Sequence, residues 1–147
     1  MSAYLLFEAA SQTFALPAHE VRQVLRMAAS APVPGAPAGL RGVLNVHGTL
    51  VPVVDVRARL GLPPRPPDPD GHLILALAGA RLVALEVDRV VEVRDLPDGA
   101  DEGPDGWSFG STLVSGAVRV ADGVVLVQAL DRFTELRDAP REAAAPP

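Results

Sequence analysis

The stretch LILALAGARLVALEVDRVVEV (residues 73–93) decides the fold, because it repeats the layout of YLLFEAASQTFALPAHEVRQV (residues 4–24). With Leu73 placed on Tyr4, 69 residues earlier, both stretches show an apolar run, a polar turn, a second apolar run and a V-x-x-V segment. Short apolar runs around a polar turn predict antiparallel β-hairpins. The same order at one spacing indicates that a structural unit occurs twice.

The repeat continues further along the chain. Gly116 to Val127 follows the pattern of Gly42 to Val53 at a spacing of 74 residues. The polar, glycine-rich segment from Asp98 to Gly110 accommodates the extra residues, as surface loops do. Chance likeness among aliphatic strands is the alternative, but it gives no reason for order and spacing to agree.

Four or five short strands per unit predict a mostly β protein of two small barrels, because closure removes exposed strand edges. The proline-rich segment 63–71 separates two lobes, placed at 1–66 and 67–136, and an exchange of chain ends between them stays open. Lobes this small have little core of their own, so we expect them to pack together around a groove. We also expect short helices at 57–60 and 131–136, and a disordered tail at 137–147.

Two local patterns are ambiguous. A helical turn opening at Pro17 carries Val21, Val24 and Leu25 at helix-like spacing, although a strand from Gln23 also fits. Further on, residues 43–56 predict a second hairpin around a polar turn. Pro52 in its returning strand predicts a sheet edge or a bulge, because proline cannot donate to a ladder.

Composition excludes several classes of protein. The chain of 147 residues is 48% hydrophobic and 21% charged, which is typical of globular domains. A formal net charge of −5 without clustered basic residues argues against nucleic-acid binding. The lack of cysteine excludes disulfides and sulfur-ligated zinc. The N-terminus does not resemble a secretory signal, and the longest apolar run is well short of a membrane span, so we expect a cytoplasmic protein.

No catalytic or metal-binding pattern emerges. His19, His47 and His72 are not at chelating spacing, and Asp68 and Asp70 fit a polar turn better than a cation loop. A phosphate-binding P-loop is impossible without lysine. Asp55, beside Arg57, is interpreted as a helix cap or ion-pair partner. We therefore expect no enzymatic activity, cofactor or metal.

Taken together, the segments GVLNVHGTLVPVVDVRARLG (42–61), LVALEVDRVVEV (82–93) and GAVRVADGVVLV (116–127) resemble the CheW family, with 4–25 resembling its opening. The likeness covers residues 4–136. It implies two small SH3-like five-stranded barrels without catalytic activity. It further implies an adaptor that couples chemoreceptors to the regulatory domain of a CheA-type histidine kinase, at membrane-associated or soluble receptor arrays.

By the same resemblance, receptor and kinase binding falls on an apolar groove and the nearby turn: Val21, Gln23, Val24, Gly42, Asn45, His47 and Gly48. Pro52, Asp55 and Gly116 belong to the structural motif. Two positions depart from the family pattern, since His47 stands for a turn arginine and Ala129 for an aspartate. An accessory array, a kinase-binding regulator or array spacer that binds no receptor, and a ligand-binding or enzymatic barrel are the alternatives.

Overall fold

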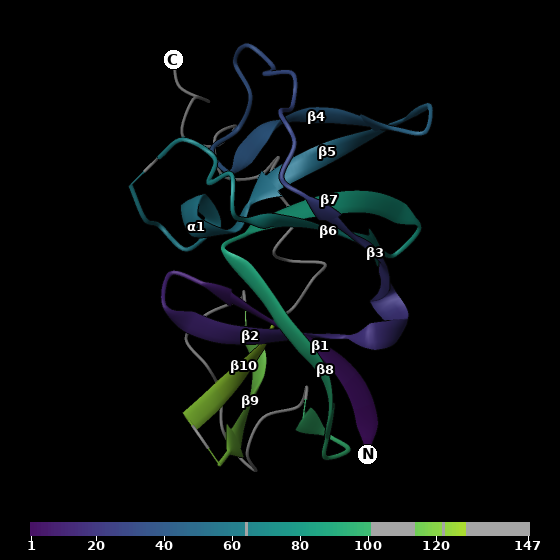
Figure 1. The fold of residues 1–147 in the computed structure, drawn as a ribbon, viewed down its shortest axis with the longest axis vertical. Helices are drawn as coiled ribbons and strands as arrows, with labels where there is room; N and C mark the ends of the chain where they lie inside the picture. Colours follow the sequence, from purple (N-terminus) through teal and green to yellow (C-terminus); the bar gives the residue numbers. More distant parts are fainter. Residues whose placement is uncertain (64, 101–113, 122, 129–147) are drawn as a thin grey trace, which may run out of the picture.

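The computed structural model describes residues 1–63, 65–100, 114–121 and 123–128, and almost all regular structure in them is β (Figure 1). The chain runs in order through β1 (Ser2–Ala9), β2 (Gln12–Pro17), the 3-10 helix η1 (Ala18–Glu20), β3 (Val21–Arg26), β4 (Leu40–Val46), β5 (Thr49–Asp55), α1 (Val56–Arg59), β6 (His72–Ala78), β7 (Arg81–Val87), β8 (Arg89–Leu96), β9 (Val114–Val120) and β10 (Gly123–Gln128).

These strands form two five-stranded sheets. Sheet 1, the lower one in Figure 1, has the order β8-β1-β2-β10-β9, and sheet 2, above it, has the order β3-β6-β7-β5-β4. In each sheet the fourth strand pairs in parallel with the third, and the other neighbours are antiparallel. The mostly β fold with two small SH3-like units, expected from the sequence, is confirmed.

The duplication is confirmed in the register of the strands. Corresponding pairs recur in both sheets at the spacings read from the sequence: Leu6–Ala15 and Leu75–Ala84, Val127–Ala15 and Val53–Ala84, Gly42–Val53 and Gly116–Val127. The irregularities recur too. The register skips Arg22 in β3 and the equivalent Val91 in β8, and it skips Arg41 in β4 and the equivalent Ser115 in β9.

Each sheet combines strands from both repeats. Sheet 1 takes β1 and β2 from the first repeat and β8 to β10 from the second, while sheet 2 takes β3 to β5 from the first and β6 and β7 from the second. The chain crosses between sheets through η1 and again at Asp88, before β8. The division of the sequence near residue 66 is therefore a boundary between repeats, and not one between sheets.

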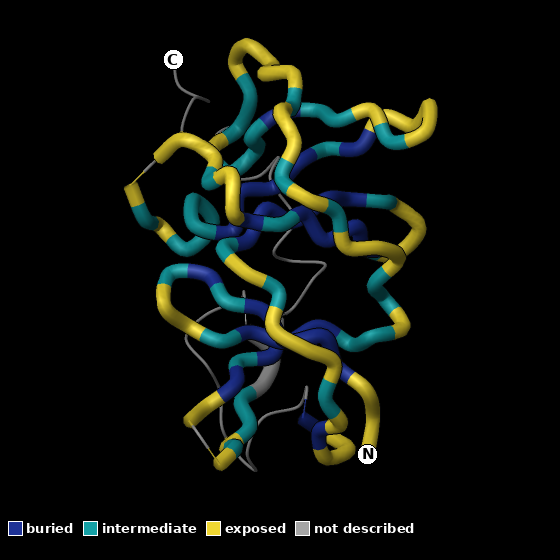
Figure 2. The backbone as a smooth tube through the Cα atoms, viewed as in Figure 1, coloured by how far each residue is buried: buried dark blue, intermediate teal, exposed yellow. Residues whose placement is uncertain are grey.

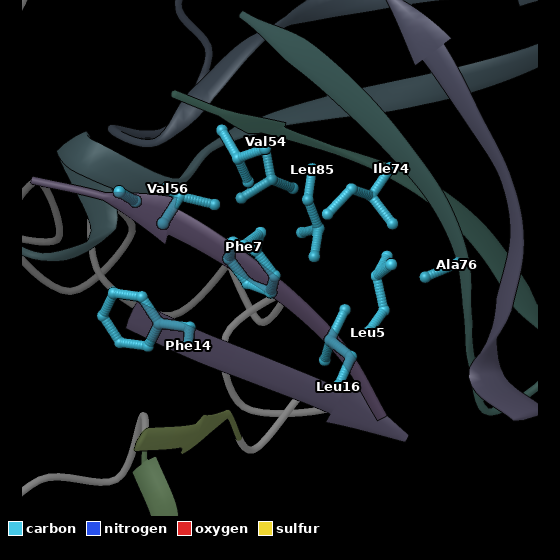
Figure 3. Packing of buried hydrophobic residues seen from close by; sticks show 11 residues of the cluster. Leu5, Phe7, Phe14, Leu16, Val54, Val56, Ile74, Ala76 and Leu85 are labelled. Atoms are coloured by element: carbon cyan, nitrogen blue, oxygen red, sulfur yellow. The ribbon is translucent and has the colours of Figure 1, made fainter. Parts of the chain in front are cut away.

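Three apolar clusters follow from strands that are buried on both faces. The largest lies between the sheets, where Phe7 and Phe14 stack with ring centroids 5.8 Å apart (Figure 3). It contains Leu5, Phe7, Ala9, Phe14, Leu16, Val54, Val56, Ile74, Ala76, Leu85 and Val87. Alternate residues of the same strands point the other way, Leu6 into a cluster of sheet 1 and Leu75 into one of sheet 2. Figure 2 shows the resulting buried centre of each sheet.

Two local expectations can be decided. Of the alternatives for the segment after Pro17, the strand is correct: it runs from Val21 to Arg26, starting two residues before Gln23, and the helical turn is limited to η1. Pro52 predicted an edge strand or a bulge, and the edge is wrong, because β5 is an inner strand between β7 and β4. Pro52 is tolerated because the β7 ladder begins only at Val53, so its own position pairs with β4 alone.

The helical turn expected at 57–60 is present as α1. The expected helix at 131–136 and the disordered tail at 137–147 lie outside the described residues.

Candidate functional site

The β4–β5 hairpin presents its polar turn to solvent, at the upper right of Figure 2. His47 and Gly48 form the two-residue turn with φ of 51° and 88°, the left-handed conformation that such turns require. Asn45 Oδ1 accepts a hydrogen bond from the Gly48 backbone N–H at 2.8 Å, which fixes the turn locally. Asn45, His47, Gly48 and the apolar Leu50, which is 71% exposed, are all available to a partner.

Gly42 lies at the base of this hairpin and is buried. A Cβ there would come within 2.5 Å of the Ala31 carbonyl oxygen and 2.6 Å of Ser30 Oγ. The connector after β3 folds back over β4, and Ala31 exchanges two backbone hydrogen bonds of 2.9 Å with Val43. This position therefore requires glycine for close backbone approach, and any binding role for it remains a prediction.

The other predicted binding residues lie on β3, at the opposite edge of sheet 2 in strand order. Val21 packs partly against the core between the sheets, while Gln23 is exposed and Val24 is 38% exposed. All seven predicted binding residues thus belong to sheet 2. Gly116 is in β9 of sheet 1, where it pairs with Val127 as Gly42 pairs with Val53.

A partly buried charge cluster, which we call the Arg41 triad, joins Arg41, Asp55 and Glu86 at the base of the same hairpin. Arg41 Nε donates to Glu86 Oε1 at 2.8 Å, and Nη2 donates to Asp55 Oδ2 at 3.1 Å and to Glu86 Oε2 at 3.3 Å. Asp55 and Glu86 are 8% and 7% exposed, and they are the buried charged residues of the described part of the chain. Asp55 also caps α1, since its Oδ1 accepts from the N–H groups of Arg57 and Ala58.

Charge and burial compete at Glu86. Burial raises its pKa above the ordinary value of 4.5, and the nearby Asp55 carboxylate adds to the rise, while the hydrogen bond and positive charge of Arg41 oppose it. For Arg41 burial alone would lower the pKa, but the hydrogen bond and charge of Glu86, with the charge of Asp55, outweigh it. Arg41 therefore stays charged, and the Glu86 carboxylate is protonated more readily than that of an ordinary glutamate, because its pKa is raised.

Asp88, where the chain crosses between the sheets, connects this region to sheet 1. Its Oδ2 accepts from the Ala10 backbone N–H at 2.9 Å, and its Oδ1 from Arg65 Nη2 of the proline-rich segment at 2.7 Å. A hollow of about 10 Å³, lined by the triad, Arg57, Arg65 and Asp88 among others, is no larger than one water molecule. The arrangement is suited to holding these elements together.

The triad was not anticipated from the sequence, apart from an ion-pair or capping role for Asp55. The sequence offered two signals of the triad: Glu86 interrupts the apolar run LVALEV, and Arg41 directly precedes Gly42, where the backbone packs closely. In the described residues, no group of three potential ligands is placed to hold a metal ion. No helix among them is long and apolar enough to cross a membrane.

Comparisons with known proteins agree with this architecture. The model of the CheW-like domain family matches residues 3–137. Over 94 residues, which are 64% of its length, this chain is 33% identical to a "Chemotaxis protein CheW" of Rhizobium meliloti and 30% identical to a "Probable chemotaxis protein CheW" of Rhizobium etli. Each match spans 61% of the relative's length. In fold, the chain is similar to the crystal structure of the scaffolding protein TtCheW from Thermoanaerobacter tengcongensis, with a TM-score of 0.81 at 24% identity, covering 91% of this chain and 92% of that one.

Proposed function

Because this chain belongs to the CheW-like domain family, we propose that it is a non-catalytic adaptor that couples chemoreceptors to a CheA-type histidine kinase in a cytoplasmic chemosensory array. The observation that carries the proposal is the match of the family over nearly the whole chain, on a fold of two interlocked five-stranded sheets. The exposed polar and apolar side chains of the site, on a hairpin whose turn is held by the Asn45–Gly48 hydrogen bond, support a binding role.

Two surfaces of sheet 2 suit such partners. The receptor's helical tip would contact β3 around Gln23 and Val24, together with the turn from Asn45 to Gly48. The kinase regulatory domain would pair through barrel edges and aliphatic faces. Exposed apolar side chains, Val24 and Leu50 among them, are available for these contacts without any rearrangement of the core.

His47 favours a second candidate, a regulator or array spacer that binds the kinase and not receptors. The turn is fully formed around His47, so the change from the family's arginine replaces a forked, permanently charged donor and leaves the backbone geometry intact. A receptor contact that depends on a guanidinium at this turn would weaken, whereas kinase contacts through barrel edges and aliphatic faces would not.

Calorimetric titration tests the adaptor role. The purified protein is titrated with the regulatory domain of a CheA-type kinase from the same genome, and separately with an isolated receptor tip. Saturable one-to-one binding to both partners is the expected result. Binding of the kinase domain alone would favour the regulator or spacer, and binding of neither by a folded protein would overturn the proposal.

The variant His47→Arg refines this test. This variant restores the side chain of the family at the turn. The backbone at position 47 has a φ of 51°, which arginine can adopt at modest cost, as histidine does here. An increase in receptor affinity without a change in kinase affinity would assign the turn to the receptor contact.

A further inference from the structure

The Arg41 triad is a feature of one sheet only, although the two sheets share their register. The positions of sheet 1 equivalent to Arg41 and Glu86 are Ser115 and Pro17. The sequence position equivalent to Asp55 is Ala129. Sheet 1 nevertheless has the same strand order, and β9 has the same skipped residue in its register. The fold of a unit therefore does not require these charges.

The triad connects the hairpin to two other elements. The skipped register at Arg41 is a β-bulge, which bends a strand and redirects a side chain. Arg41 uses this direction to reach Glu86 in β7 and Asp55 at the end of β5, and Asp55 in turn holds the first turn of α1. A planar guanidinium that bridges two carboxylates fixes orientation as well as distance. The hairpin is thus fixed at its base to β7 and α1, and its turn projects freely beyond.

We propose that Arg41 is a positioning residue for partner binding, which sets the direction of the β4–β5 hairpin through Asp55 and Glu86. This inference rests on the proposed adaptor function for its binding half. A buried ion pair is weak evidence of stabilisation, since apolar residues of similar volume often serve as well, and its better attested use is to specify one arrangement. The sheet without the triad is the internal example of a unit that folds by apolar packing.

The decisive variant is Arg41→Met combined with Glu86→Met, which replaces the charged pair by apolar groups and keeps Asp55 as the cap of α1. Arg41→Met alone would leave both carboxylates without their cation, and unfolding would then obscure the result. In the double variant only Asp55 loses this partner, and it keeps the backbone N–H groups of Arg57 and Ala58 as donors. The matched control is Arg89→Met, which removes an exposed arginine that pairs with Glu8 in sheet 1. Arg41→Lys keeps the charge but loses the fork.

Two measurements separate positioning from stability. Hydrogen exchange in the free protein should accelerate in β4 and β5 of the double variant and remain unchanged in β1 and β2. Affinity for the kinase regulatory domain or receptor tip, measured where all variants are fully folded, should fall by about tenfold, because the competent orientation is only partly populated. The affinity of Arg41→Lys should lie between those of the wild type and the double variant, and the affinity of Arg89→Met should equal that of the wild type.

Wild-type affinity in a folded double variant would overturn the inference, as would faster exchange spread evenly over both sheets. If the wild-type protein binds neither partner, the adaptor function fails, and the exchange comparison alone decides whether Arg41 orients the hairpin.

Discussion

Asp55 has two separable roles, and replacing it in two ways should resolve them. One carboxylate oxygen caps α1, with bonds of 3.0 and 3.3 Å to the N–H groups of Arg57 and Ala58, while the other pairs with Arg41 at 3.1 Å. Asparagine caps helices about as well as aspartate, so Asp55→Asn keeps the first role and loses only the charge. Asp55→Ala loses both.

The expected costs follow from these contacts. Loss of the cap costs about 1 kcal/mol, and loss of a charge-assisted hydrogen bond costs about 1.5–3 kcal/mol. The second cost falls at the lower end, because Arg41 keeps Glu86 as a partner and removal of the Asp55 charge relieves its repulsion of Glu86. We therefore expect Asp55→Asn to lower the free energy of unfolding by about 1–2 kcal/mol, and Asp55→Ala by about 1 kcal/mol more.

Urea denaturation at neutral pH, followed by circular dichroism, measures both differences, provided that the slope with denaturant is the same for all variants. Hydrogen exchange at Arg57 and Ala58 gives an independent reading of the cap. Equal destabilisation by asparagine and alanine would show that the cap contributes nothing. A larger effect of asparagine than of alanine would refute the whole assignment.

Three further predictions follow from burial and charge. The stability of Glu86→Gln relative to wild type should rise from about pH 4 to pH 7: the folded pKa of Glu86 is raised, so the contribution of its titration to wild-type stability is present below the unfolded pKa and is lost as pH rises through the folded one; a relative stability that falls with pH in urea titrations would contradict this. Gly42→Ala should cost about 1–3 kcal/mol in thermal unfolding, because its Cβ meets the Ala31 carbonyl at 2.5 Å; an unchanged Tm would show that the connector moves freely. Phe7→Ala should cost about 3–5 kcal/mol, as Phe7 is fully buried between the sheets, against almost nothing for the exposed Leu50→Ala control; similar losses would disprove the core assignment.

Much of this fold follows from the sequence, because a period of two and the recurrence of one pattern are strong signals. The exchange of strands between the repeats cannot be predicted from these signals. Both repeats carry equivalent strands. The apolar pattern of β2 is therefore compatible with pairing to β5 of its own repeat or to β10 of the other repeat, and the structure has the second pairing. Only the three-dimensional path through η1 and Asp88 distinguishes the two.

Two local features were harder to predict, for physical reasons. The register of β3 skips Arg22, which interrupts the period-two alternation of the strand and left the helix-like spacing of Val21, Val24 and Leu25 as a competing signal. The Arg41 triad was missed because its members are 14 and 45 residues apart in sequence, and charged residues are normally read as exposed. For the seven predicted binding residues, the structure shows position and exposure, and their roles stay predictions.

The exchange of strands has a consequence for the history of the chain. A single repeat contributes two strands to one sheet and three strands to the other, so in this strand order neither sheet is complete without the other repeat. Two identical copies, however, would complete both by trading their first hairpins, which is the geometry of a domain-swapped homodimer. Fusion of such a dimer into one chain frees each half to diverge. Here sheet 2 carries the histidine turn and the Arg41 triad, to which the first repeat contributes Arg41 and Asp55 and the second contributes Glu86, so a molecule with a symmetric plan presents two different ends.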